Sequence, residues 1–539
     1  MPTKTERKIL SFSTTMRNPY RIGSFLAILS KYENQILTHE VIMNIVKDII
    51  YNKLYTPNYI LQNDELKSCL NSDNFFTNKQ IEDIIKNAPQ NHKEAGFDNG
   101  WESRFDTWYK LMCEFGFCYY KKEYPILISD TAKILIDTVY DSTTGTFNDD
   151  YDESIIGSVF LNTLAKYEVG NPYKKNLNHN TPFRLLIKLL LKLKQHNKKP
   201  ISVKEVPILL CWHNDNIDVL YDYIINLRDE NYQMTGIENS YSPEFIYHKC
   251  LNLLESENKK RFKLQQIVSE AVDEYIRKMR ITGLISLRGN GRYIDINSLE
   301  HEKIEYISKL NSCFQGDYQD NSEDSKLKFY KYMSTVDNFL ITASLISCND
   351  NVKIDKLKEM AKSYKAEEIK QELLITCDKS KSSNVEFLKI LDKPLRLEFL
   401  TAIYLTQHFY NVSIIPNYKS DDEGYPIFTA SGGKADIIAF DEKTESYIEV
   451  SLIRDRTQTT NEMIPIQRHL QEYIANSVNN KEKFSVFVAP NIHNDSKDYA
   501  KFVKYKYNIN IPYYAMADFI KKVEISNCLI ELNDERLLI

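Results

Sequence analysis

The sequence lacks any apolar segment long enough to span a membrane. Its longest apolar stretch, near Leu185–Leu193, is interrupted by Lys188 and Lys192. The first eight residues carry no apolar core of the kind that a signal peptide needs. Nine cysteines are scattered along the chain, and the closest pair, Cys113 and Cys118, misses the CxxC spacing of zinc ligands. We therefore expect a reduced, cytoplasmic protein without a membrane segment, a disulfide framework or structural zinc.

The chain also lacks the excess of positive charge that many DNA-binding proteins carry. It has 69 basic and 74 acidic side chains, which gives a formal net charge of −5. A DNA partner would therefore need a locally basic surface. The contents of hydrophobic and charged residues, 42% and 27%, are typical of a soluble globular protein.

A chain of 539 residues is too long for one hydrophobic core, so we expect several domains. Polar, linker-like stretches interrupt the apolar pattern at residues 141–154, 315–326 and 378–384. The predicted division has four parts, at residues 1–145, 146–300, 301–380 and 381–539. The first two parts are predicted to be mostly helical with short hairpins, the third to be a helical linker, and the fourth to mix helices and strands.

Two segments of the N-terminal half have the element order of a winged-helix module, in which a helix is followed by a hairpin. They are a helix at 101–115 with extended segments at 117–120 and 124–129, and a helix at 264–279 with strands at 283–287 and 293–296. The second hairpin has a basic, glycine-rich turn that contains Arg288 and Arg292. A winged helix can lay its helix in the major groove while the hairpin contacts phosphates. The alternative is an ordinary helix and hairpin whose arginines keep the turn soluble.

The C-terminal 150 or so residues predict a three-layer α/β arrangement around a small mixed sheet. The expected elements are helices at 394–409, 464–478 and 497–505, strands at 412–415 and 484–489, and a hairpin between residues 436 and 451. Each strand of that hairpin carries one acid in an otherwise apolar, β-branched run: Asp436 on the first and Glu449 on the second. Glu462 follows at the same interval of thirteen residues.

A buried carboxylate is costly unless it has a partner, and one divalent cation can serve two carboxylates at once. Hydrolysis of a phosphodiester needs an attacking water and relief of charge on the phosphate, which carboxylate-held Mg²⁺ supplies. The spacing of Asp436, Glu449 and Glu462 therefore predicts a metal-dependent nuclease site. A solvated acidic patch in a DNA-binding protein with an inactive nuclease domain is the alternative.

Other residues near the three acids are candidates for the same site. Pro465 fixes a helix start next to Glu462, because proline is tolerated only in the first helical turn. His469 is seven residues after Glu462 and can share its helix face, although a lone helical histidine is often structural. Lys434, two residues before Asp436, is expected on the same strand and the same side, where it could offset phosphate charge or simply be exposed. Glu398 lies on the preceding helix and can face either way.

These residues carry a resemblance to known nucleases. Asp436 with Glu449-Val450-Ser451 resembles the PD-(D/E)xK nuclease fold, except that Ser451 stands where that motif has lysine. The segments 432–437 and 448–451, the downstream Glu462, and 467–469 together resemble the AlwI-type family of type IIS restriction endonucleases and related site-specific nicking endonucleases. The segment 13–22 is similar to an N-terminal segment of the same family.

The resemblance implies a multidomain α+β protein that cuts DNA. Residues 1–145 and 146–300 would be winged-helix-like DNA-recognition subdomains, 301–380 a helical linker, and 381–539 the PD-(D/E)xK-like nuclease domain. It implies Mg²⁺, with Mn²⁺ as a substitute, held by Asp436, Glu449 and Glu462. Glu398 and His469 would complete the catalytic group. The missing lysine leaves the water-activating group unassigned.

The implied activity is cleavage of double-stranded DNA a few base pairs outside a short asymmetric site. Strand-specific nicking, alone or as the large subunit of a heterodimeric enzyme, is the alternative, because one catalytic group cuts one strand at a time. A transient homodimer or a small second nuclease subunit would then act on the DNA, and the cell would hold a cognate DNA methyltransferase. Arg17 and Arg21, one helical turn apart, suit phosphate contacts. The alternative for their segment is an apolar cap on the N-terminal fold.

Overall fold

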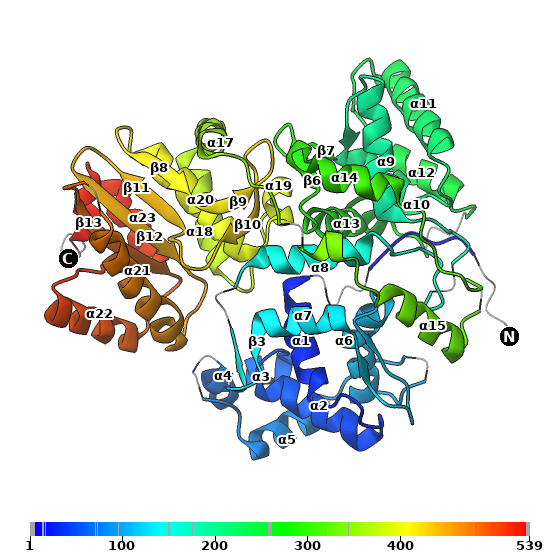
Figure 1. Ribbon diagram of the computed structural model, residues 1–539, viewed down its shortest axis with the longest axis horizontal. Coiled ribbons are helices and arrows are strands. Elements are labelled where there is room, and N and C mark those ends of the chain that lie inside the picture. The colour runs from blue at the N-terminus through cyan, green and yellow to red at the C-terminus, as the bar shows by residue number, and fades with distance from the viewer. Residues whose placement is uncertain are drawn as a thin grey trace. The chain divides into compact units, whose positions relative to one another are not determined.

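The computed structural model describes residues 6–12, 16, 18–70, 72, 74–94, 96–148, 151–174, 176–256, 261–318, 320–342, 344–477 and 479–534. The chain forms two compact units (Figure 1). The first comprises Met1–Tyr55, Ile85–Asn148 and Ser154–Leu345, and the second comprises Thr56–Ile84, Asp149–Glu153 and Ile346–Ile539. The expected mixture of helices and strands is confirmed. No helix among the described residues is long and apolar enough to cross a membrane.

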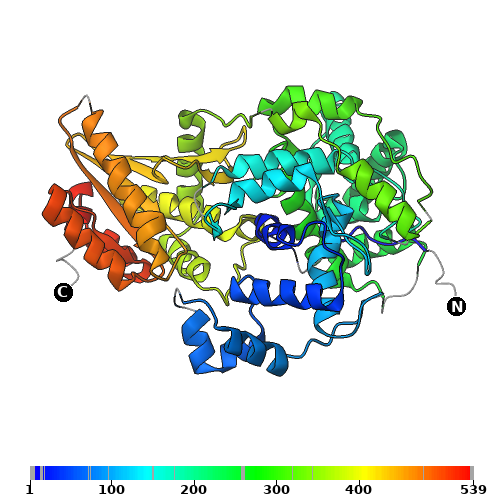
Figure 2. The same cartoon turned by 60° about the horizontal axis from the view of Figure 1, so that its bottom comes forward.

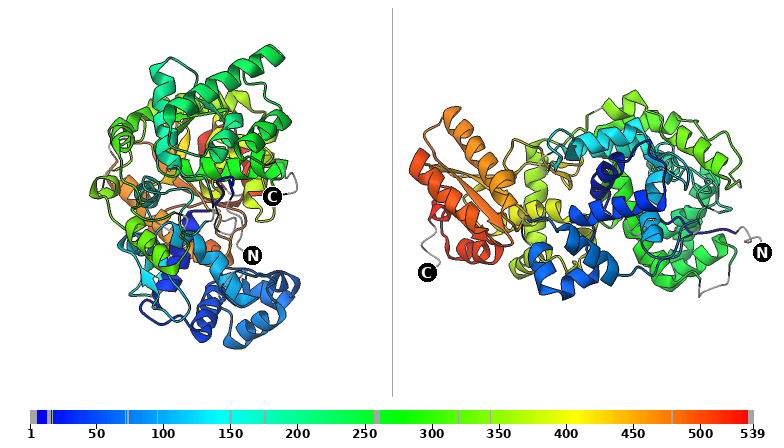
Figure 3. Two further views of the ribbon diagram at one scale, coloured as in Figure 1. Left: turned by 90° about the vertical axis from the view of Figure 1, so that its right-hand side faces the viewer. Right: turned by 90° about the horizontal axis from the view of Figure 1, so that it is seen from below.

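The first unit is mostly helical and holds short sheets. Its helices are α1 (Tyr20–Ser30), α2 (His39–Tyr51), α6 (Trp101–Glu114), α7 (Asp130–Val139), α8 (Glu153–Leu164, whose first residue belongs to the second unit), α9 (Pro182–Gln195), α10 (Val206–Cys211), α11 (Ile217–Thr235), α12 (Pro243–Leu253), α13 (Ala271–Arg280), α14 (His301–Lys309), α15 (Glu323–Met333) and α16 (Asn338–Thr342). Its strands are β1 (Cys118–Tyr119), β2 (Leu127–Ile128), β3 (Tyr140–Asp141), β4 (Thr146–Phe147), β5 (Ile201–Ser202), β6 (Ile285–Arg288) and β7 (Tyr293–Ile296). Helices α9 to α14 are drawn in green in Figures 1 and 3.

Local sequence signals set these helix starts. The Thr38 hydroxyl accepts a hydrogen bond from the Val41 amide and caps α2. Pro182 occupies the first turn of α9, where its missing amide hydrogen costs nothing. The predicted hairpins are present as β1–β2 and β6–β7. Strand β7 also pairs with β5, so the second hairpin belongs to a three-stranded sheet of order β5-β7-β6.

The second unit is built on a five-stranded mixed sheet of order β14-β13-β12-β11-β8. Its strands are β8 (Ser413–Pro416), β9 (Tyr418–Ser420), β10 (Pro426–Ala430), β11 (Ile437–Phe440), β12 (Thr444–Val450), β13 (Glu482–Ala489) and β14 (Tyr513–Ala515). Its helices are α3 (Asn58–Gln62), α4 (Asp64–Leu70), α5 (Asn78–Asn87, which extends past Ile84), α17 (Asp350–Ser363), α18 (Ala366–Cys377), α19 (Glu386–Ile390), α20 (Lys393–His408), α21 (Ile464–Ala475), α22 (Asn494–Tyr507) and α23 (Met516–Ile525). The chain passes from β12 through α21 to the parallel strand β13, a helical crossover.

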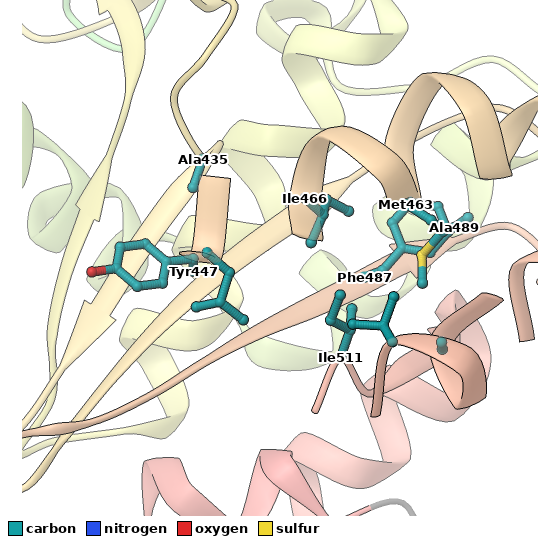
Figure 4. Packing of buried hydrophobic residues seen from close by; sticks show 10 residues of the cluster. Ala435, Tyr447, Met463, Ile466, Phe487, Ala489 and Ile511 are labelled. Atoms are coloured by element: carbon teal, nitrogen blue, oxygen red, sulfur yellow. The ribbon is translucent and has the colours of Figure 1, made fainter. Parts of the chain in front are cut away.

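Apolar side chains fix α21 and α22 to one face of this sheet. Met463 and Ile466 pack with Phe487 and Ala489 of β13 in a core that is nearly free of solvent (Figure 4). Helix α21, in orange, runs along the strands in Figure 2. Helix α20 packs against β8 and β10. The predicted three-layer pattern identified these helices and the central strands, but it missed β14 and the separate β9–β10 hairpin.

Candidate active site

The hairpin β11–β12 places Asp436 and Glu449 directly across from one another. Ile437 pairs with Ile448 in the antiparallel register, so the next residue pair beyond β11 is Asp436 and Glu449. The Val450 amide donates to Asp436 Oδ2 at 2.8 Å, and the Asp436 amide donates to Glu449 Oε2 at 3.2 Å. Each carboxylate is thus oriented by the backbone of the hairpin. Like charges directly opposite on adjacent strands repel, so this pair favours a cation between them.

Helix α20 turns Glu398 inward, which resolves the two orientations that the sequence left open. Its side chain is only 4% exposed, and its Oε2 accepts a hydrogen bond from the Ala430 amide at 3.1 Å. Burial, followed by the negative charge of Asp436, raises the pKa of Glu398 well above its usual range. The charges of Glu153 and Glu449 act in the same direction.

Glu462 and His469 come from the start of α21 and the turn before it. Glu462 lies in a π-helical turn, Thr459–Met463, and α21 begins at Ile464. Pro465 has no amide hydrogen to continue an α-helical ladder at this point, and π-helical turns are often found at functional sites. His469 is buried, and its Nε2 lies 3.5 Å from Arg468 Nη2.

One cavity of about 470 Å³ collects the predicted catalytic residues. Its lining includes Glu398, Asp436, Glu449, Glu462 and His469. All of these belong to the second unit. The structure therefore brings together residues that span more than seventy positions of the sequence, and their catalytic roles stay a prediction.

Lys434 also lines this cavity, but not from the strand on which it was expected. It is exposed in a turn in which its amide donates to the Ser431 carbonyl, and β11 begins only at Ile437. The glycines Gly432 and Gly433 form the tip of that turn, and Gly433 has a φ of +84°, a conformation that suits glycine. The expectation of one strand carrying Lys434 and Asp436 was wrong because these glycines delay the start of β11.

Ser451 lines the cavity at the position where the common nuclease motif has lysine. Its side chain is buried, and its Oγ accepts a hydrogen bond from the Ile453 amide at 3.1 Å. A short neutral hydroxyl held in this way cannot supply the positive charge of a lysine. The water-activating group therefore remains unassigned.

The carboxylates suit a hard divalent cation. Burial and mutual repulsion disfavour the charged form of Glu398, and a cation would relieve both effects. Within the part of the chain that the structure describes, no three His, Cys, Asp or Glu side chains lie close enough together to hold a metal ion. One or two carboxylates together with water and substrate phosphates can hold such a cation, and the facing Asp436 and Glu449 are sufficient in number.

The arginines predicted to contact DNA belong to the first unit. Arg17 lies outside the described residues. Arg21 is exposed, and its guanidinium donates to the Leu54 carbonyl and lies 5.4 Å from the centre of the Phe25 ring. The phosphate contact predicted for Arg17 and Arg21 therefore stays a prediction.

The two arginines of the β6–β7 hairpin differ in their surroundings. Arg288 is mostly buried against the hairpin, where its guanidinium donates to the Ile296 carbonyl and lies 3.5 Å from Asp295. Arg292 is exposed at the turn and donates through Nε to the Gly289 carbonyl. Of the two, Arg292 is thus better placed to reach a phosphate.

Sequence reasoning missed one acid of the cavity, Glu153. It reaches the cavity from a segment 245 residues before Glu398, and its Oε2 accepts from the Thr429 amide at 3.1 Å. Burial raises the pKa of Glu153 to about 7. It lies at the end of a polar stretch, Asp141–Ser154, that resembles a linker in the sequence, so no local pattern marked it.

The chain matches a family of known nucleases. Residues 113–517 match the AlwI restriction endonuclease family, and this range covers more than half of the chain. The chain belongs to the AlwI restriction endonuclease family. The matched range contains the cavity residues named above, Glu153 among them. As a restriction endonuclease, the protein is a nuclease that acts on DNA.

No curated protein sequence matches the chain. Among solved structures, the chain is similar to the small subunit R.BspD6I2 of the heterodimeric restriction endonuclease R.BspD6I, at 24% identity over 28% of this chain and 76% of that one, with a TM-score of 0.23. Restriction endonuclease FokI matches at 11% identity over 96% of both chains, with a TM-score of 0.25, or 0.24 for FokI bound to DNA.

Proposed function

We propose that this AlwI-family protein is a Mg²⁺-dependent endonuclease of type IIS character. It would hydrolyse a phosphodiester bond a few base pairs outside a short asymmetric DNA site. The observation that carries this proposal is the facing pair Asp436 and Glu449, in one cavity with the buried Glu398. A mixed sheet whose antiparallel hairpin carries the acids, with helices on both sides, supports a PD-(D/E)xK-like domain.

Each cavity residue has a role that its position supports. Asp436 and Glu449 would hold the cation, because a backbone amide of the facing strand orients each of these carboxylates. Glu462, predicted as a third ligand, lines the same cavity but does not form a close group of three with them, so it would contact the cation through a bound water. When bound, the cation would neutralise phosphate charge and favour attack by water. Lys434, exposed at the rim of the cavity, would contact a phosphate oxygen of the DNA. His469 would orient a carboxylate or the phosphate from α21.

The first unit would read the DNA sequence. Its sheet order β5-β7-β6, with α9 before β5 and with α10 and α13 before the β6–β7 hairpin, resembles the order of a winged helix into which α11 and α12 are inserted. The segment from α1 to β2 follows the same plan, since Ile36 pairs with Pro125 next to the β1–β2 hairpin. The two hairpin-bearing segments support two DNA-recognition subdomains, predicted at 1–145 and 146–300. The linker predicted at 301–380 and the nuclease domain predicted at 381–539 stay proposals, and helices α17 and α18 of the linker range belong to the second unit together with the cavity residues. Arg292 would contact the DNA backbone from the second hairpin.

Strand-specific nicking is the second candidate function. The chain supplies one set of Asp436, Glu449 and Glu398, and such a set cuts one strand at a time. Cleavage of both strands would therefore need a transient homodimer, a small second nuclease subunit, or repositioning of the same site. A host cell would need a cognate DNA methyltransferase to protect its own recognition sites.

Incubation with supercoiled plasmid tests the proposed chemistry. With Mg²⁺ we expect conversion to nicked or linear DNA, and with EDTA we expect none, because carboxylates without a cation cannot offset phosphate charge. Gel electrophoresis separates the three forms. Linear product supports cleavage of both strands, whereas nicked circles alone support the nicking alternative. Plasmid that stays supercoiled in both Mg²⁺ and Mn²⁺, while the protein still binds DNA, would instead indicate an inactive nuclease domain.

A further inference from the structure

Strand β10 is held at its end by two acids from distant parts of the chain. The Thr429 amide donates to Glu153 Oε2, and the next amide, of Ala430, donates to Glu398 Oε2, each at 3.1 Å. Both acids line the same cavity. Glu153 thus lies one backbone residue away from the contact that orients a predicted catalytic carboxylate.

The pairing of β10 alone does not fix this point of the backbone. β10 pairs with β9 in a sheet of only two strands, and the register shifts between Pro426 and Phe428 and again between Phe428 and Ala430. Such irregularities interrupt the regular ladder of hydrogen bonds. The exposed turn that contains Gly432 and Gly433 follows directly. The end of β10 therefore depends on side-chain contacts for its position.

The segment that contains Glu153 makes a second contact with the β9–β10 hairpin. Asp152 forms an ion pair with Lys419 of β9, in which Nζ lies 2.8 Å from Oδ1 and 2.9 Å from Oδ2. The neighbouring residues Asp152 and Glu153 therefore reach β9 and β10, respectively. Only the Glu153 contact involves the backbone next to Ala430.

We propose that Glu153 is a positioning residue of the cleavage site, which fixes the end of β10 so that the Ala430 amide holds the Glu398 carboxylate in the cavity. This inference rests on the proposed nuclease function. The hydrogen bond from the Thr429 amide, rather than the charge of Glu153, positions the backbone. Both the neutral and the ionised carboxyl keep an oxygen that accepts this hydrogen bond. A pKa of about 7 for Glu153 is compatible with either form near neutral pH.

Two substitutions at this position separate the hydrogen bond from the charge. Glu153→Gln keeps an oxygen acceptor and removes the charge, whereas Glu153→Ala removes both. With cleavage of plasmid DNA in Mg²⁺ as the readout, we expect Glu153→Ala to lower kcat by about tenfold or more, since small displacements in an active site are costly. Glu153→Gln should stay within about threefold of the wild type, in keeping with the modest net worth of one hydrogen bond. KM for DNA should not change in either variant.

Asp152→Asn is the matched control, because it removes the neighbouring ion pair and leaves the Thr429 contact. We expect its kcat to equal that of the wild type, since a partly exposed ion pair contributes little. Wild-type kcat in Glu153→Ala, an equal loss in Glu153→Gln and Glu153→Ala, or an equal loss in Asp152→Asn would each overturn the inference. Absence of cleavage by the wild type in the same assay would instead refute the proposed nuclease function.

Discussion

Asp436→Asn and Glu449→Gln are each expected to reduce DNA cleavage by about a thousandfold or more, because a lost metal ligand removes several kcal/mol of transition-state stabilisation. The two acids face one another across β11 and β12, and each is oriented by an amide of the opposite strand. Both replacements keep the size of the side chain and an oxygen that can accept the same amide hydrogen bond. The loss should therefore appear in kcat and leave folding intact. Timed plasmid cleavage in Mg²⁺ measures it.

Glu442→Gln is the control for both variants, because Glu442 is an exposed acid in the turn of the same hairpin and does not line the cavity. It should cut DNA at the wild-type rate. Binding of DNA, measured by gel shift in EDTA, should be unchanged in all three variants if the first unit reads the DNA. Wild-type cleavage by Asp436→Asn or Glu449→Gln would refute the assignment of the cation site.

Glu398→Gln is expected to raise the thermal stability of the metal-free protein at pH 8. The pKa of Glu398 is raised by burial and by the charges around it, so ionisation of this side chain disfavours the folded state. Below the ordinary glutamate pKa the group is protonated in both folded and unfolded chains, and no penalty exists. As the pH rises, the unfolded chain releases its proton first, and stability falls until the folded group ionises as well.

The pH window follows from the raised values. For Glu153, in the same cavity, the pH range over which stability falls lies between the ordinary pKa of 4.5 and the raised pKa of about 7. The pKa of Glu398 is also raised, so its range likewise begins at the ordinary value and extends upward. In EDTA, the melting temperature of the wild type should therefore fall as the pH rises through this range. Glu398→Gln should fall less and melt a few degrees higher at pH 8. Differential scanning fluorimetry at pH 5 and pH 8 makes the comparison, again with Glu442→Gln as the control.

Mg²⁺ should reverse the fall in melting temperature at high pH, since a ligand that binds only the folded state stabilises it by mass action. Its stabilisation of the wild type should be larger at pH 8 than at pH 5, because the raised pKa values of Glu398 and Glu153 leave these two neighbouring carboxyls largely protonated at pH 5. A melting temperature that is independent of pH in EDTA, together with a lower stability of Glu398→Gln at pH 8, would show that the carboxylates do not repel one another in the metal-free protein.

Local patterns in the sequence predicted the part of the site that depends on neighbouring residues. The alternation around Asp436 and Glu449, with a polar turn between, predicted a hairpin, and the observed register places the two acids opposite one another. The seven-residue spacing of Glu462 and His469 placed both at the cavity, although Glu462 lies in a π-helical turn just before the helix. Side chains return to the same face every two residues in a strand and every 3.6 residues in a helix, so residue spacing alone predicts which side chains share a face.

Long-range contacts account for what the sequence could not predict. The inward orientation of Glu398 depends on β10, a strand that sequence reasoning missed because its short hairpin is a separate two-stranded sheet. Glu153 meets Thr429 across 276 residues, and no local periodicity encodes such a pairing.

Run-off sequencing of both strands of DNA cut by the purified protein in Mg²⁺ tests the account most directly. It reports the recognition site, the position of each cut and the number of strands cut in one experiment. If the first unit binds the recognition sequence and thereby positions the Asp436–Glu449 site, the cuts lie at a fixed distance outside one short asymmetric sequence. Cuts scattered without a common sequence, or cuts within a symmetric site, would contradict a nuclease domain that is aimed by a separate recognition unit.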